Sequence, residues 1–271
     1  MNIIKESFHL TNKYIILAVP PVFFSLFSGF YIMFSLRGSA FGILIAFVLF
    51  LAMLAAFLAG WFYMIKTCIT ETEKDVDSLL GEFPAGVGEY FLSAAGMVLN
   101  IFVIAAVIFT AAYLTGMTFI GDVGISAEAL SKAMESSALL MAFMTSLDSG
   151  QLFRLNAWNF LIFAAISLNW FLVMFYPPAL FLGSKNPFKA YFVSIKILFG
   201  RKFFKNVALF LFILVCYCTL SLFAAVCGGN IMLHFLCSIL NFYYLIFAAV
   251  LVYCFYYRSF VKTGANLDKI I

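Results

Sequence analysis

Charged residues are scarce in this sequence, and their scarcity excludes an ordinary soluble fold. Lys, Arg, Asp and Glu together make up 10% of the 271 residues, against about 25% in typical globular domains. Apolar residues make up 65% of the chain, and its mean hydropathy is +1.10. A composition of this kind is typical of an integral membrane protein.

Motifs that hold metals, phosphates or catalytic nucleophiles are also missing. The sequence contains no HExxH, CxxC or GxSxG motif and no phosphate-binding glycine loop. Its two histidines are His9, in the short N-terminal segment, and His234, close to one end of an apolar run. We therefore expect no catalytic residue, no metal and no cofactor, and a protein that is not an enzyme.

Several other features are absent and exclude further classes of function. No basic patch has the spacing of a nucleic-acid site, so nucleic acid is not an expected partner. Apart from His234, no ionisable residue lies inside an apolar run, which disfavours a proton-coupled transporter. The six cysteines are expected to pack in the core, with a Cys227–Cys237 disulfide as the alternative.

Long apolar runs recur along the whole chain. A helix needs about 20 apolar residues to cross the hydrocarbon core of a membrane. The runs are apolar on every face, unlike the alternating strands of a membrane barrel. We therefore expect an all-α, multi-pass membrane protein with about six spans: 14–36, 41–65, 91–114, 158–182, 203–226 and 231–257.

The distribution of positive charge predicts the orientation of these spans. With the N-terminus inside, thirteen of the sixteen Lys and Arg residues fall in cytoplasmic segments. Positively charged loops stay on the cytoplasmic side, so both termini are expected there. No linker or shift in composition divides the chain, so we expect a single transmembrane domain over 1–271.

The segment 187–200 is predicted to be an amphipathic helix in the membrane interface. Asn186 can cap it, and Pro187 suits its first turn. One face would expose aromatic and aliphatic side chains to lipid, and the nearby bases would contact lipid headgroups; the alternative is an inward extension of the fifth span. The apolar face holds Phe188, Tyr191, Phe192, Ile195, Leu198 and Phe199, and the bases are Lys189, Lys196, Arg201 and Lys202.

Weaker interfacial segments are expected at 3–13 and 87–94, before the first and third spans. A further helical stretch should run from a Ser126 cap to about Leu147, on the outer side. These segments would surround the spans without crossing the membrane.

Two proline pairs, Pro20-Pro21 and Pro177-Pro178, interrupt the first and fourth spans. Proline removes backbone hydrogen bonds and kinks a helix, and broken helices form substrate sites in several transporters. The alternative is a simple kink where a span meets its interfacial segment. Three asparagines within spans could line the same cavity or make interhelical hydrogen bonds: Asn100, Asn169 and Asn241.

Two cytoplasmic segments carry opposite charge. The segment 66–89 has two bases and six acids, whereas 183–205 has six bases and no acid. We expect the two segments to contact each other. The alternative is that the bases contact anionic lipid and the acids bind a partner protein.

Several short motifs lie near the ends of the spans. They are Gly60-Trp61-Phe62, Gly81-Glu82-Phe83-Pro84, Pro178-Ala179-Leu180-Phe181, Pro187-Phe188-Lys189-Ala190, Ser194-Ile195-Lys196, Lys202-Phe203-Phe204 and Phe255-Tyr256-Tyr257-Arg258. Together they resemble a loose group of six-span prokaryotic membrane proteins of unknown function, and the membrane domain of some glycerophosphodiester phosphodiesterases is similar as well. The resemblance implies a membrane module of a prokaryotic inner membrane, without the hydrolytic domain of those enzymes.

These observations favour a non-enzymatic, membrane-embedded subunit or accessory scaffold. Its expected partners are membrane lipids and a partner protein or a second copy of the chain. The alternative is a permease-like transporter of an apolar or lipidic solute, with a cavity beside the proline pairs. An enzyme acting within the membrane is the third hypothesis.

Overall fold

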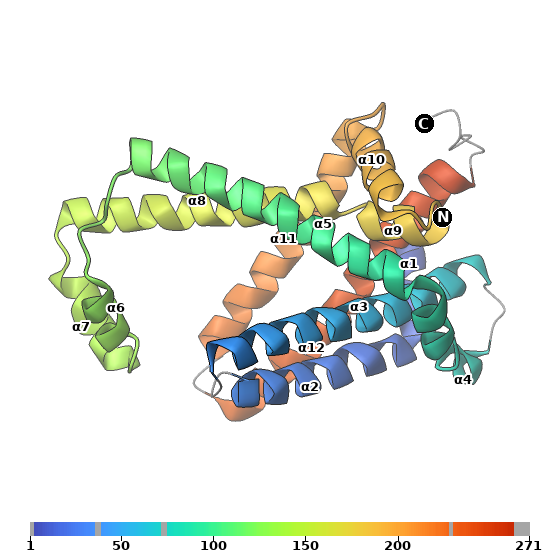
Figure 1. Cartoon of the computed structure of the whole chain (residues 1–271), viewed down its shortest axis with the longest axis horizontal. Helices are drawn as coiled ribbons and strands as arrows, with labels where there is room; N and C mark the ends of the chain where they lie inside the picture. Colours follow the sequence, from blue (N-terminus) through green and yellow to red (C-terminus); the bar gives the residue numbers. More distant parts are fainter. Residues whose placement is uncertain (1–2, 36–38, 72–74, 228–229, 263–271) are drawn as a thin grey trace. The chain divides into compact units, whose positions relative to one another are not determined.

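The computed structural model describes residues 3–35, 39–71, 75–227 and 230–262, and in these ranges it contains helices and no strand (Figure 1). Six helical segments within them are long and apolar enough to cross a membrane. The expected all-α fold with six spans is therefore confirmed. The side of the membrane on which the termini lie stays a prediction.

The spans correspond closely to the apolar runs of the sequence. Their helices are η1 (Ile15–Ala18) with α2 (Val19–Ser35), α3 (Ala40–Thr70), α5 (Glu82–Phe119), α8 (Ser149–Val173) with α9 (Tyr176–Leu182), α11 (Phe203–Val226), and α12 (Ile231–Tyr256) with the π-helical turn η3 (Tyr257–Val261). The largest difference is α5, which begins at Glu82 and includes the expected interfacial segment 87–94. Glu82 suits the positive end of the helix dipole, so the helix begins well before the apolar run.

Five shorter helices lie between or before the spans: α1 (Ile3–Lys13), α4 (Val76–Leu79), α6 (Ala127–Ala133), α7 (Ser137–Ser146) and α10 (Pro187–Leu198). Ser126 accepts a hydrogen bond from the Ala129 amide (3.2 Å), as its expected capping role requires. The stretch that follows is two helices rather than one, because Ser136 caps a second helix through the Leu139 amide (3.2 Å).

The chain forms two compact units. Unit 1 comprises Met1–Ile101 and Leu172–Ile271, and unit 2 comprises Phe102–Phe171. The chain passes from one unit to the other within α5 and again within α8. The expectation of a single domain stays a prediction.

Helix α12 lies at the centre of unit 1, where it packs against α1, α3, α9 and α11. Helix α2 packs beside α3, and α9 packs on α10. Gly60 of α3 allows the ring of Phe83 to approach closely, because a Cβ there would lie 2.6 Å from that ring. The core is unusually aromatic, with Tyr14, Phe175, Tyr176, Phe181, Tyr253 and Tyr256 almost fully buried.

Unit 2 has little core of its own. Its described residues include only three buried ones, namely Gly116, Ala133 and Ala165. The start of α8 is tied to the loop that follows α5, since Trp158 Nε1 donates to the Gly121 carbonyl at 3.0 Å and Arg154 donates to the Asp122 carbonyl at 2.9 Å. Most apolar side chains of unit 2 are therefore not buried within the unit.

Candidate functional site

Both proline pairs lie in the first turn of a helix. Pro20 and Pro21 follow η1 and begin α2, and Pro177 and Pro178 begin α9. Proline suits a first turn because the amide that it lacks would have no helical partner there. Spans one and four are therefore broken at these pairs, as the sequence predicts.

A side chain from α3 supplies the hydrogen bond that is missing at the break in the first span. In a continuous helix the Leu17 carbonyl would accept from residue 21, but Pro21 has no amide proton. The indole of Trp61 supplies the missing donor, with Nε1 3.0 Å from the Leu17 carbonyl oxygen. Pro20 and Pro21 are both buried beside this bond.

The three candidate asparagines have different surroundings. The Asn100 amide donates to the Tyr176 hydroxyl at 2.8 Å, which joins α5 to α9 next to the second proline pair. Asn169 belongs to unit 2, and Asn241 is half-buried on α12. Asn100 therefore makes an interhelical hydrogen bond, which was the alternative to lining a cavity.

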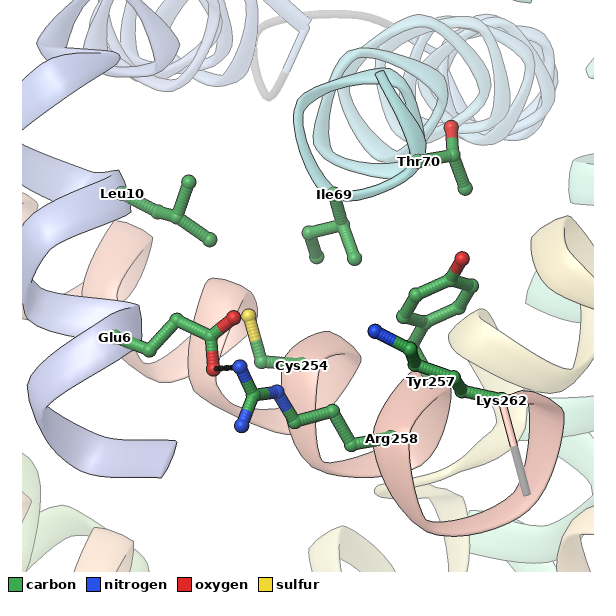
Figure 2. A pocket seen from close by; sticks show the side chains of 8 residues that line it. All are labelled: Glu6, Leu10, Ile69, Thr70, Cys254, Tyr257, Arg258 and Lys262. Atoms are coloured by element: carbon green, nitrogen blue, oxygen red, sulfur yellow. Dashed lines mark ion pairs between the residues drawn. The ribbon is translucent and has the colours of Figure 1, made fainter. Parts of the chain in front are cut away.

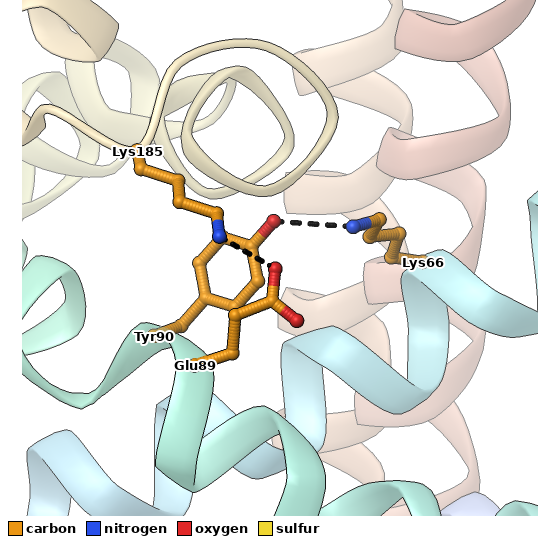
Figure 3. Close-up of polar contacts among 4 residues, drawn as sticks. All are labelled: Lys66, Glu89, Tyr90 and Lys185. Atoms are coloured by element: carbon orange, nitrogen blue, oxygen red, sulfur yellow. Dashed lines mark hydrogen bonds and ion pairs between the residues drawn. The ribbon is translucent and has the colours of Figure 1, made fainter.

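A second polar cluster surrounds Tyr90 of α5, which is almost fully buried (Figure 3). The Lys66 ammonium donates to the Tyr90 hydroxyl at 3.1 Å and lies over the rings of Tyr63 and Tyr90. The Tyr90 ring also stacks on Phe181 of α9, with centroids 4.6 Å apart. The cluster thus joins α3, α5 and α9.

The expected contact between the oppositely charged segments occurs at one ion pair of this cluster. Lys185 Nζ lies 2.8 Å from Glu89 Oε1 and 5.1 Å from the centroid of the Tyr90 ring (Figure 3). The hydrogen bond to the Glu89 carboxylate raises the pKa of the Lys185 ammonium above its ordinary value. Of the other acids of this segment, Glu73 lies outside the described residues.

Helix α10 forms within the segment predicted at 187–200 and ends at Leu198, and its place in the membrane interface stays a prediction. The expected cap is present, since Asn186 accepts from the Lys189 amide at 3.2 Å. Its buried stripe is Ala190, Val193, Ser194, Ile197 and Leu198. Leu198, which we expected on the exposed face, lies on this stripe because it follows Ser194 by one helical turn.

The opposite face of α10 is exposed and aromatic. Phe188 and Phe192 are each 65% exposed, and Phe199 directly after the helix is 56% exposed. Lys189, Lys196 and Arg201 are exposed beside them. Tyr191 is half-buried, with its ring 5.4 Å from that of Tyr176, and burial raises the pKa of its hydroxyl.

The end of α10 is fixed by Asn206, a buried residue of α11. The last carbonyls of a helix lack helical donors, and the Asn206 amide supplies one to Ile197 at 2.9 Å and to Leu198 at 3.0 Å. Lys202 also acts within the protein, because its ammonium donates to the Ser259 carbonyl at 2.9 Å. Of the four candidate headgroup contacts, Lys202 is thus engaged at the end of the last span.

A polar pocket lies between α1, α3 and the end of α12 (Figure 2). Its volume is about 200 Å³. Arg258 Nη2 lies 2.6 Å from Glu6 Oε2, an ion pair that joins the two ends of the chain. Our reading of the sequence missed this pocket, since nothing in the local pattern pairs the two residues. The pocket is lined by Glu6, Leu10, Ile69, Thr70, Cys254, Tyr257, Arg258 and Lys262.

The short motifs that carry the family resemblance contact one another in unit 1. Gly60 faces Phe83, and the ring centroids of Phe62 and Phe181 lie 5.7 Å apart. Comparisons of the chain with models of known protein families, with curated proteins and with solved structures find no significant match. The resemblance to the phosphodiesterase membrane domain stays a prediction.

The polar clusters of unit 1 consist of cations, aromatic rings and carboxylates. In the described ranges no three His, Cys, Asp or Glu side chains lie close enough to hold a metal ion, and the cysteines described there are all free thiols. The two carboxylates of the clusters, Glu6 and Glu89, are each held by a base. What the arrangement offers is a set of cations and aromatic rings at one end of unit 1.

Proposed function

We propose that this protein is a non-enzymatic, membrane-embedded scaffold subunit of a prokaryotic cytoplasmic membrane, which binds lipid or a partner protein through α10. The observation that carries the proposal is the two-sided character of α10. One side of the helix packs against the rest of unit 1 through its buried stripe and through Asn206. The other side exposes phenylalanines among lysines.

The side of α10 that packs against the rest of unit 1 holds the helix in a fixed position on the protein surface. Asn206 holds its last turn, the ring of Tyr191 rests on that of Tyr176, and Lys202 joins the next turn to the end of the last span. A helix fixed in this way is pre-organised, so binding does not require it to fold first.

The exposed side has the composition of a membrane-surface helix. Phenylalanines can enter the boundary between headgroups and acyl chains, while lysines stay among anionic headgroups. Each base near such a surface contributes about 1 kcal/mol. A protein partner with an acidic, apolar surface would meet the same requirements.

Co-purification tests the proposal. We expect the wild-type protein, extracted in a mild detergent, to retain anionic lipid or a partner protein that mass spectrometry identifies. Replacing Phe188, Phe192 and Phe199 together with Ser should lower the retained amount. Phe119→Ser, at a position in unit 2 that is 83% exposed, is the control. Equal retention by the triple variant and the control would contradict the proposal.

The orientation that the proposal assumes can be tested separately. With both termini in the cytoplasm, single cysteines in place of Asp75 and Lys189 should react only with reagents applied from the cytoplasmic side. A cysteine in place of Lys132 should react only from outside. A reversed pattern would move α10 to the outer surface and refute this part of the proposal.

A permease for a lipidic solute is the second candidate, favoured by the two broken spans. Discontinuous helices can form substrate sites near the middle of the membrane. Pro20, Pro21 and Pro178 are, however, buried in packed surroundings, and the pocket in unit 1 has no proline in its wall. Vesicles that contain the protein and a fluorescent lipid discriminate, because dithionite quenches only the outer leaflet unless lipid crosses. Quenching well beyond half would support the permease.

A further inference from the structure

We propose that the pocket beside Glu6 and Arg258 binds a phosphate group, supplied by the headgroup of an anionic phospholipid or by a soluble phosphate ester. The site is separate from α10 and does not depend on the function proposed for that helix. It rests on the shape of the pocket, on its hydrogen-bond donors and on its position along the spans.

The size of the pocket suits a headgroup fragment. Its volume of about 200 Å³ is below the roughly 300–1,000 Å³ of pockets that enclose a drug-sized ligand. Leu10 and Ile69 form an apolar part of the wall, and the other lining side chains are polar or bear a thiol. A compact polar group with an apolar continuation fits such a space.

The donors around the pocket suit an anion. A guanidinium has five N–H donors, so Arg258 can contact Glu6 with one nitrogen and still donate to a ligand. Lys262 follows Arg258 by four residues at the same end of the last span, and its ammonium end reaches into the same space (Figure 2); in the described residues it forms no ion pair. Two cations against one carboxylate leave the lining with a net charge of +1.

A hydroxyl group completes the set of donors. Tyr257 lines the pocket beside Thr70, whose own hydroxyl donates to the Lys66 carbonyl at 3.0 Å, and Figure 2 shows the Tyr257 hydroxyl directed toward the end of α3 that carries Thr70. Phosphate oxygens accept readily from hydroxyl groups as well as from arginine and lysine. Glu6 holds Arg258 in place and limits the site to one anionic group.

The position of the pocket favours a lipid as the source of phosphate. Thr70 is the last residue of one apolar span, and Val261, directly before Lys262, is the last residue of another. The charged side chains therefore lie where apolar spans end, which is the depth of lipid headgroups. Basic pockets between membrane helices bind anionic headgroups at this level.

Lipid binding by matched lysine variants tests the proposal. The purified protein is stripped of lipid in detergent, and bound phosphatidylglycerol is then titrated by native mass spectrometry. We expect Lys262→Gln to weaken binding about fivefold, because it removes a donor without breaking the Glu6–Arg258 pair. Lys5→Gln removes an exposed charge from α1 outside the pocket and should leave binding unchanged. Equal affinities in the two variants would overturn the proposal.

A second variant and a soluble ligand complete the test. Tyr257→Phe removes a hydroxyl that lines the pocket at nearly constant volume and should also weaken binding, so the proposal does not depend on one variant. Glycerol 3-phosphate, added without lipid, distinguishes the sources. If it raises the melting temperature of the wild type and not of Lys262→Gln, as strongly as phosphatidylglycerol does, the site binds a soluble phosphate ester. If neither ligand distinguishes the wild type from Lys262→Gln, the pocket binds no phosphate.

Discussion

Unit 1 and unit 2 are both built from apolar helices, yet their described residues differ in how many side chains they bury within the unit. In unit 1, side chains form hydrogen bonds with distant parts of the sequence, such as Trp61 with the Leu17 carbonyl and Asn100 with the Tyr176 hydroxyl. In the described residues of unit 2, the long-range hydrogen bonds join the start of α8 to the loop after α5. Its helices otherwise expose large apolar side chains, such as Phe153 and Phe160.

The difference shows what stabilises helices in lipid. Lipid tails are as apolar as leucine, so an apolar face gains little by turning toward another helix. Association depends on close packing and on hydrogen bonds between helices. Unit 1 has glycines at crossings and polar side chains at helix breaks, whereas unit 2 has few of either between its helices. Unit 2 therefore relies on its surroundings for contacts that unit 1 makes internally.

The largest expected effect comes from removing a core ring in unit 1. Phe181→Ala deletes a buried ring that stacks on Tyr90 and should lower the free energy of unfolding by about 2–4 kcal/mol. Phe160→Ala in unit 2, where that ring is 73% exposed, should change it by much less. Denaturation in detergent measures both. Similar losses would show that the two units do not differ in the way proposed.

Adding a methyl group at a helix crossing is expected to have the next largest effect. The Cβ of Gly60→Ala would lie 2.6 Å from the Phe83 ring, so the ring must move, and we expect a loss of about 1–3 kcal/mol. Gly29→Ala on α2 is the control because its Cβ would meet nothing within 4 Å. There the better helix propensity of alanine should leave the thermal stability unchanged or raise it. A loss of equal size at both glycines would exclude steric contact as the cause.

A smaller effect is expected from a single interhelical hydrogen bond. Tyr176→Phe leaves the Asn100 amide without its partner at the break before α9 and should lower the unfolding free energy by about 1 kcal/mol. In unit 2, Trp158→Phe removes the indole bond to the Gly121 carbonyl and should have a similar effect, confined to the start of α8. Hydrogen exchange near each bond shows whether the loss spreads through unit 1 and stays local in unit 2.

The smallest expected effect is that of the Lys185–Glu89 pair, and it depends on pH. The pKa of Lys185 is raised in the folded protein, so folding favours its protonated form. The stabilisation is complete below the ordinary ammonium pKa and is lost as the pH rises through the higher folded value. Wild type and Lys185→Gln should therefore differ in stability at neutral pH and converge in strongly alkaline buffer. A difference that grows with alkaline pH would contradict this assignment.

The contacts that make up the candidate site could be predicted from the sequence only in part. The Asn186 cap and the start of α10 follow from residues next to each other in the chain, and both are confirmed. The exposure of Leu198 was predicted wrongly, because helical periodicity identifies an apolar face without showing which part of it meets a neighbour. The Trp61–Leu17 bond was not predicted, although the two prolines mark the carbonyl that needs a donor.

The sequence by itself determined the number of the spans and their approximate positions. The length of an apolar run and the first-turn preference of proline are local properties, and the membrane acts on them wherever the helices finally pack. Only the tertiary structure decided which polar side chains meet. Glu6 and Arg258 lie at opposite ends of the chain, and the pocket between them exists because α1 packs on α12. Such pairs depend on how the helices pack against one another, and no local pattern of residues contains that information.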